Sequence, residues 1–150
     1  MKILKVAIIG CGNIFPMHAQ SIKVVENAKL VAVCDIKVER AKQKGEQYDC
    51  NYYTDYKEMF SKEDIDVVHI CLPHFLHAEV AIYAAKQGIN IFTEKPMAIK
   101  LSDAEEMIKT AKDNKVILGV IFQNRYNPGS QLIKKTLESG GTWENFVREA

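Results

Sequence analysis

An apolar run from Val6 to Ile9 ends at Gly10, and a second glycine, Gly12, follows after one residue. A short β-branched run that stops at a glycine predicts a buried parallel strand. Two glycines directly after such a strand allow a sharp turn into a helix, and they leave room for a phosphate at the helix N-terminus. The chain therefore begins with a predicted strand–turn–helix unit that binds a nucleotide.

The third position of the dinucleotide-binding glycine pattern is Phe15, where glycine or alanine is usual. The first helix must therefore pack on the sheet in a different way. The same two glycines are also compatible with a turn that only connects a strand to a helix. The sequence that follows decides between these interpretations.

Strand and helix patterns alternate along the whole chain, and the connections between them are short. Strands are predicted at residues 3–9, 28–34, 51–54, 66–72, 89–93 and 116–122. Helices are predicted at residues 14–25, 38–47, 55–60, 78–87, 102–114 and 130–138, and the helix at 102–114 opens with the capping-box pattern Ser102-Asp103-Ala104-Glu105. This alternation predicts an α/β protein with a doubly wound parallel sheet, the Rossmann fold.

Length and charge exclude several classes of protein. A chain of 150 residues is about one domain, and a formal net charge of +1 gives no reason to expect nucleic acid or a membrane surface as partner. No apolar run approaches the roughly 20 residues of a membrane span, and the first residues are interpreted as a strand, not a signal peptide. No Cys-x-x-Cys pair occurs among the four cysteines, so reduced thiols and a cytoplasmic location are predicted for Cys11, Cys34, Cys50 and Cys71.

Asp35 directly follows the second predicted strand. A carboxylate at this place accepts hydrogen bonds from the adenosine ribose of a dinucleotide, and it repels a 2′-phosphate. Asp35 therefore favours NAD over NADP, although Lys37 offers an ammonium group that can pair with that phosphate. A cap of the following helix is the alternative role for Asp35.

Glu94, Lys95 and Pro96 follow another predicted central strand. Ligands of open α/β sheets bind at such strand ends, and Pro96 disfavours a helical conformation at Lys95. A lysine in a pocket of this kind can act as general acid or base. An exposed ion pair in a loop explains the same spacing equally well.

The segment from Cys71 to His77 follows a further central strand. Cys71, His74 and His77 are spaced by three residues, as metal ligands can be, but Pro73 interrupts the run and the sequence offers no second ligand group nearby. We interpret His74 and His77 as polar groups that line a cofactor cleft, and predict no metal site. His77 is also a candidate for a helix N-cap.

The remaining histidines receive no catalytic role. His69 lies within a predicted strand, as expected of a core histidine with a hydrogen-bond partner, and His18 lies in the first predicted helix. The sequence contains no Gly-x-Ser-x-Gly motif, no Walker lysine and no Cys–His nucleophile pair.

Together these motifs resemble the glucose-fructose oxidoreductase, inositol dehydrogenase and rhizopine-catabolism (Gfo/Idh/MocA) family over about residues 3–140. The segments that carry the resemblance are Gly10-x-Gly12-Asn13-Ile14, Asp35, Leu72-Pro73-His74-x-x-His77, Glu94-Lys95-Pro96 and Gln123-Asn124-Arg125-Tyr126-Asn127-Pro128. At His74 the family often has asparagine, and at Leu72 it often has a small hydroxyl residue.

The resemblance implies that residues 1–122 form a Rossmann domain that binds NAD or NADP. Lys95 would lie between nicotinamide and substrate and assist hydride transfer at a carbon of a sugar or cyclitol. The implied cofactor-binding residues are Gly10, Gly12, Asn13, Ile14, Asp35, Leu72, Pro73, His74, His77, Glu94, Lys95 and Asn124.

In the family a C-terminal α/β domain follows and supplies most of the substrate pocket, but residues 123–150 read only as a linker and a helix. Ser139-Gly140 matches the expected approach to that domain, whereas Gly141 to Phe146 does not resemble the strand that should come next. We therefore expect a truncated product or isolated domain that binds NAD and turns over poorly. Exposed apolar surface, with Trp143 and Phe146 in the tail, predicts a homo-oligomer.

Two alternatives to an enzyme remain open at this point. One is a non-catalytic NAD(H)-binding module that acts as a sensor or regulator. The other is a Rossmann-like interaction protein that binds no cofactor.

Overall fold

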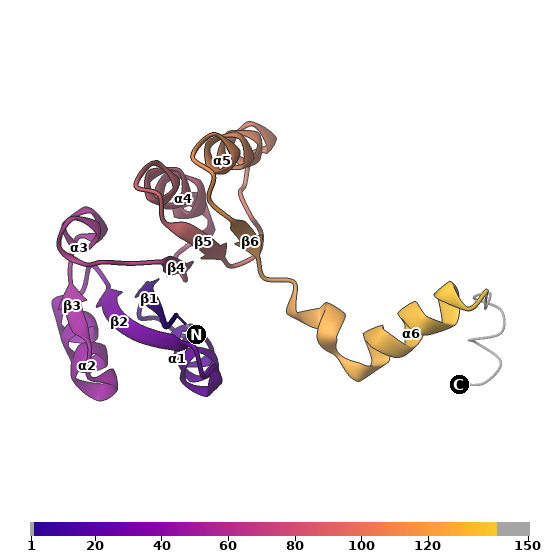
Figure 1. Cartoon of the computed structure of the whole chain (residues 1–150), viewed down its shortest axis with the longest axis horizontal. Helices are drawn as coiled ribbons and strands as arrows, with labels where there is room; N and C mark the ends of the chain where they lie inside the picture. The colour runs from indigo at the N-terminus through magenta and orange to yellow at the C-terminus, as the bar shows by residue number, and fades with distance from the viewer. Residues whose placement is uncertain (1, 141–150) are drawn as a thin grey trace.

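The computed structural model describes residues 2–140, and within this range six parallel strands form one sheet in the order β3-β2-β1-β4-β5-β6 (Figure 1). The order reverses between β1 and β4, and this reversal marks the switch point at which open α/β sheets bind ligands. The predicted doubly wound Rossmann fold is thereby confirmed. The strands are β1 (Leu4–Ile9), β2 (Ala28–Cys34), β3 (Asn51–Tyr53), β4 (Val67–Ile70), β5 (Asn90–Thr93) and β6 (Leu118–Val120).

Helices cover both faces of the sheet. In Figure 1, α1 (Phe15–Val24) and α2 (Val38–Tyr48) lie on one face, while α3 (Tyr56–Lys62), α4 (His77–Lys86) and α5 (Leu101–Asp113) lie on the other. The last helix, α6 (Pro128–Glu138), stands away from the sheet and follows a 3-10 turn at Gln123–Tyr126.

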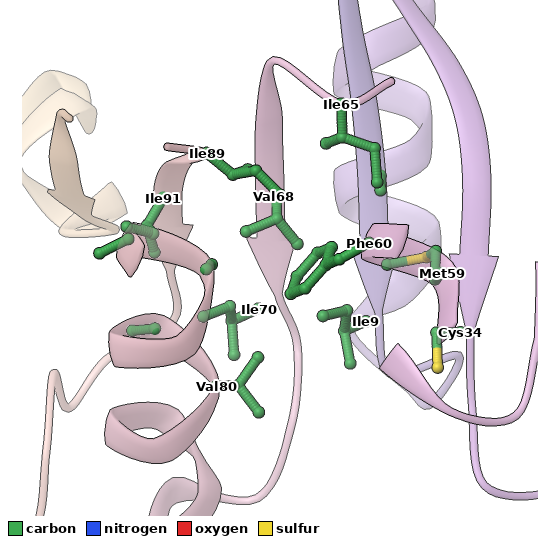
Figure 2. Packing of buried hydrophobic residues seen from close by; sticks show 14 of the residues in the cluster. Ile9, Cys34, Met59, Phe60, Ile65, Val68, Ile70, Val80, Ile89 and Ile91 are labelled. Atoms are coloured by element: carbon green, nitrogen blue, oxygen red, sulfur yellow. The ribbon is translucent and has the colours of Figure 1, made fainter. Parts of the chain in front are cut away.

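The core has two layers because alternate residues of each strand point to opposite faces. Ile9 belongs to the larger cluster, which Figure 2 shows together with Val68, Ile70, Phe60 and Val80. The smaller cluster lies under α1 and α2, and its largest member is the fully buried ring of Phe15.

Phe15 stands where the glycine pattern usually has glycine or alanine, and its ring is accommodated by contacts with α2 and the sheet. Its ring meets the ring of Tyr48 from α2 edge-on, with 5.4 Å between centroids, and packs with Ile8 and Val33. A side chain of this size at the start of α1 therefore fills the space between α1, α2 and the sheet.

The capping box predicted at Ser102 is wrong. Helix α5 begins one residue earlier, its N-cap is Lys100 in extended conformation, and no described side chain caps it. The Ser102 hydroxyl lies inside the first turn and donates to Asp103 Oδ1 at 3.3 Å. The sequence pattern was present, but the helix started at Leu101 and removed Ser102 from the capping position.

Other boundaries agree with the prediction or shift by one or two residues. The last strand is shorter than predicted because the Asn90 side chain, rather than a strand, accepts the Ile117 N–H at 2.9 Å. The helix after the Asn127-Pro128-Gly129 segment begins at Pro128, where proline fits the first helical position. Trp143 and Phe146 lie outside the described residues. Within residues 2–140, no helix is long and apolar enough to cross a membrane.

Candidate functional site

Gly10 occupies the switch point, where a larger residue would be strained. Its φ angle is +100°, and a Cβ atom would lie 2.3 Å from the Cys71 carbonyl oxygen at the end of β4. Its N–H donates to the Cys34 carbonyl at the end of β2 at 2.7 Å. The glycine thus lets the end of β1 lie against both neighbouring strands.

Gly12 has the opposite environment. No described atom lies within 4 Å of a Cβ built on it, so the backbone faces open space at the beginning of α1. The helix N-cap, Ile14, makes no side-chain cap bond to a described residue, and the first turn of α1 contains no acidic residue. In the first turn Phe15 and Met17 donate their N–H groups to the Gly12 and Ile14 carbonyls, and Pro16 has no N–H. The open space at Gly12, directly before the helix, is therefore the feature that fits the pyrophosphate of a dinucleotide.

Asp35 is almost buried, with 9% of its surface exposed, and both of its carboxylate oxygens are used. Oδ2 accepts the Cys11 N–H at 2.9 Å, and Oδ1 accepts the Lys37 N–H at 2.9 Å. Lys37 is itself the N-cap of α2, so Asp35 closes the turn before that helix without capping it. Each carboxylate oxygen can accept a further hydrogen bond, which leaves capacity for a ribose hydroxyl.

Glu94 and Lys95 lie at the carboxyl end of β5. The Glu94 side chain is 15% exposed, its Oε1 lies 3.2 Å from His18 Nε2, and its Oε2 accepts the Lys95 N–H at 3.2 Å. Lys95 is exposed, and its peptide bond to Pro96 is cis. Among the described ion pairs, Glu94 pairs with His18 and not with Lys95, so a Glu94–Lys95 loop ion pair is not what the structure contains.

His18 and His69 join this site, although sequence reasoning gave them no role in it. Their Nδ1 atoms lie 3.0 Å apart, and the two rings meet edge-on. Burial, followed by the nearby His18, lowers the pKa of His69 to about 4. One signal was present in the sequence: Phe15, His18, Ala19 and Ile22 fall on one helical face, and that face points at the sheet.

His77 differs from its prediction. Its ring is fully buried, so it cannot line a cofactor cleft, and it is the first residue of α4 after the N-cap Leu76. Nδ1 lies 2.9 Å from the Pro96 carbonyl and Nε2 lies 2.9 Å from the Leu72 carbonyl. The ring therefore joins the chain after β4 to the chain after β5, and both contacts are hydrogen bonds only when both nitrogens carry protons.

The metal-site alternative fails for the same reason. Both nitrogens of His77 face carbonyl oxygens, so none remains for a metal. No group of three or more possible metal ligands occurs within residues 2–140.

The other predicted residues lie where strands end. Leu72, Pro73 and His74 follow β4, with Pro73 and His74 exposed, and the exposed Asn124 lies in the 3-10 turn that follows β6. The structure thus brings the predicted set to the carboxyl edge of one sheet. The segments that meet at this edge are Gly10–Ile14 after β1, Asp35 after β2, Leu72–His74 after β4, Glu94–Lys95 after β5 and Asn124 after β6.

The arrangement is that of a known family. The sequence profile of an oxidoreductase family with an NAD-binding Rossmann fold, Gfo/Idh/MocA, matches residues 4–122. The chain belongs to this family. The resemblance inferred from the motifs is thereby confirmed.

Relatives of this chain include dehydrogenases of cyclitols. The chain is 30% identical to myo-inositol 2-dehydrogenase of Thermotoga maritima over 138 residues, which are 91% of this chain and 41% of that protein. It is 34% identical to 2,7-anhydro-N-acetylneuraminate hydratase of Mediterraneibacter gnavus over 140 residues, which are 93% of this chain and 37% of that protein. This family member thus spans about two fifths of the length of these relatives.

A solved structure also matches the whole described fold. The WlbA dehydrogenase from Bordetella pertussis, in complex with NADH and UDP-GlcNAcA, superposes with a TM-score of 0.90 at 30% identity. The match covers 93% of this chain and 40% of that one. The family binds NAD, and it includes an NADP-dependent scyllo-inositol 2-dehydrogenase of Bacillus subtilis that is 31% identical to this chain.

Proposed function

We propose that this chain is the cofactor-binding part of an oxidoreductase that acts on a hydroxyl group of a sugar or cyclitol, with NAD as its preferred cofactor and NADP as a possible one. The observation that carries the proposal is the place of Lys95. It is exposed at the carboxyl end of β5, beside the switch point where Gly10 and Gly12 open α1.

In this proposal each strand end has one task. The open turn at Gly12 and the N-terminus of α1 hold the pyrophosphate, and Asp35 accepts hydrogen bonds from the adenosine ribose. A bound nicotinamide supplies the centre that accepts or gives a hydride. Lys95 Nζ takes the proton of the substrate hydroxyl during oxidation and returns it during reduction.

The substrate class is proposed from the relatives. The inositol dehydrogenases act on a cyclitol, and the WlbA structure contains a nucleotide sugar. Both are ring compounds with several hydroxyl groups. We propose also that the 150 residues alone turn over slowly, since Lys95 is exposed and no described residue covers it.

Binding and turnover test the proposal in two steps. Titration of NADH, followed by its fluorescence, measures binding, and NAD reduction with a panel of inositols and sugar nucleotides measures turnover. We expect Lys95→Met to lower turnover by about 10²–10⁴-fold with little change in NADH affinity. Lys100→Met, an exposed lysine at the N-cap of α5, should leave both quantities unchanged.

Other outcomes identify the alternatives. The sensor would be favoured if the wild type and both variants bind NADH tightly, if none of them turns over, and if Lys95→Met leaves the NADH affinity unchanged. No binding of NADH or NADPH at millimolar concentration would favour an interaction protein without cofactor.

We propose further that the chain is cytoplasmic and associates with itself. Four free cysteines, three of them buried, support a reducing compartment. Exposed apolar side chains along α6 support self-association, namely Leu132, Ile133 and Leu137. Sedimentation velocity of the chain tests the second point, and a monomer at all concentrations would contradict it.

A further inference from the structure

Three polar side chains from three different elements form a continuous series of contacts that leads to Lys95; we call it the His69–His18–Glu94 chain. His69 comes from β4, His18 from α1 and Glu94 from the end of β5. The Nδ1 atoms of the histidines lie 3.0 Å apart, and His18 Nε2 lies 3.2 Å from Glu94 Oε1. His18 is 5% exposed and Glu94 is 15% exposed, so water competes little for these contacts.

The protons of this chain follow from the contacts. The Glu94 carboxylate only accepts, so the proton of His18 must be on Nε2. When His18 carries this proton alone, its Nδ1 accepts, and the proton between the two histidines belongs to His69 Nδ1. A neutral His69 meets this requirement, and burial keeps it neutral by lowering its pKa to about 4.

Few other titratable groups surround the His69–His18–Glu94 chain. Burial and then Glu94 raise the pKa of the Cys71 thiol, so this neighbour stays uncharged. The Phe92 ring lies against His69, with 5.2 Å between centroids. No buried side-chain nitrogen or oxygen within residues 2–140 lacks a hydrogen-bond partner.

Glu94, at one end of the His69–His18–Glu94 chain, contacts the backbone of the candidate catalytic residue, Lys95. Glu94 uses Oε1 for His18 and Oε2 for the Lys95 N–H, at 3.2 Å. A carboxylate held from both sides has one orientation, and it fixes the peptide from which the Lys95 side chain starts. His18 also belongs to the first turn of α1, which opens at the glycine turn.

We propose that His69 and His18 are positioning residues that act through Glu94 to fix Lys95 at the nicotinamide half of the cofactor site. The inference rests on the proposed function. Asp35 at β2 defines the adenosine half, so the nicotinamide half of a bound dinucleotide lies on the other side of the switch point, over β4 and β5.

Ring nitrogen chemical shifts of the cofactor-free chain give the first test, because they report which nitrogen of each histidine carries the proton. We expect the proton on Nε2 in His18 and on Nδ1 in His69. In His18→Leu, the Lys95 amide signal should move, since Glu94 loses its second partner. A proton on His18 Nδ1 alone, or an unmoved Lys95 amide, would overturn the proposal.

Comparison of two ligands gives the second test. His18→Leu should weaken NADH binding by about tenfold and leave the affinity for ADP-ribose unchanged, because ADP-ribose lacks the nicotinamide. His18→Gln should restore NADH binding, since its amide N–H can reach Glu94. Glu63→Gln, which removes a carboxylate bonded to Tyr53 elsewhere in the fold, should change neither affinity.

The two proposals can fail separately. Equal losses for NADH and ADP-ribose would mean that His18 serves only general stability, and this would overturn the positioning role. If His18→Leu does not fold, His69→Phe replaces it, with a loss of several-fold for NADH alone expected. If the wild-type protein binds no NADH, the proposed function fails. The ring nitrogen chemical shifts of the cofactor-free protein then still test the hydrogen bonds between His69, His18 and Glu94.

Discussion

Asp35 Oδ2 accepts the N–H of Cys11 at 2.9 Å, so the carboxylate at the end of β2 is bonded to the residue between the two glycines at the end of β1. The residue proposed to bind the ribose and the turn proposed to bind the pyrophosphate are therefore one hydrogen-bonded unit. A change at Asp35 must affect both.

Asp35→Ala should lower both stability and cofactor affinity. The buried Cys11 N–H loses its acceptor, which costs about 1–3 kcal/mol of unfolding free energy. The loss of the negative charge should also reduce the preference for NADH over NADPH, because the 2′-phosphate is no longer repelled. Urea unfolding and fluorescence titrations with both cofactors measure the two effects.

Asp55→Ala is the matched control for this variant. Asp55 likewise accepts the N–H of the residue two positions later, Lys57, at 2.8 Å, but it caps α3. We expect a loss of about 1 kcal/mol and an unchanged NADH to NADPH ratio. An unchanged ratio in Asp35→Ala as well would remove Asp35 from the ribose site.

Gly10→Ala and Gly12→Ala should separate folding from binding. At Gly10 the positive φ and a Cβ 2.3 Å from the Cys71 carbonyl predict a loss of about 1–3 kcal/mol or more. At Gly12 a Cβ meets no described atom, so stability should change by less than about 1 kcal/mol, while NADH affinity falls because the Cβ occupies the phosphate space. Thermal unfolding and NADH titration distinguish the two, and unaltered NADH binding in Gly12→Ala would place the phosphate elsewhere.

The fold was largely predictable because its signals are local. Apolar runs that stop at Gly10 or Asp35 define strand ends, and the alternation with helices leaves few arrangements other than a doubly wound sheet. The predicted bounds of β2 agree with the observed ones. The capping box failed because one residue, Leu101, joined the helix ahead of Ser102.

The candidate site was predictable only where chain position determines location. Residues that follow strands meet at one edge whatever their side chains do, and this rule placed Asp35 and Glu94. The direction of a buried ring depends on packing between distant elements, which explains the error at His77 and the omission of His18 and His69. Contact of any of these residues with a cofactor stays a prediction.

The cysteines should react slowly in the native chain. Burial raises the pKa of Cys11 and Cys34 to about 12 and that of Cys50 to about 11. At pH 8 the native thiolate fraction is therefore far below that of an unfolded cysteine, whose pKa is about 8.5. Alkylation by iodoacetamide, followed by mass spectrometry with and without urea, should show labelling mainly in urea.

The raised pKa values of the cysteine thiols also predict a loss of stability at alkaline pH. The folded thiols bind protons more tightly than the unfolded ones, so their contribution is complete below pH 8.5 and decreases as the pH rises through about 11 and 12. Urea midpoints should fall across this range. Cys50→Ala, at the least buried of the four, should reduce the slope, and an unaltered slope would contradict the assignment.

His69 predicts a loss of stability in acid. Its pKa is about 4 in the folded chain and about 6.5 in the unfolded one, because burial and the neighbouring His18 disfavour the charged ring. Between these values the unfolded state binds the proton and the native state does not. Stability is therefore complete above pH 6.5 and decreases by on the order of 3 kcal/mol as the pH falls to 4.

His69→Phe should flatten this acid limb, because the unfolded chain then has one fewer histidine to protonate and the ring can still pack on Phe92. His74→Ala is the control, since His74 is an exposed histidine whose removal should leave the slope between pH 6.5 and 4 as it was. Urea midpoints measured at half-unit steps of pH give both slopes. Equal slopes in His69→Phe and the wild type would mean that folding does not lower the pKa of His69.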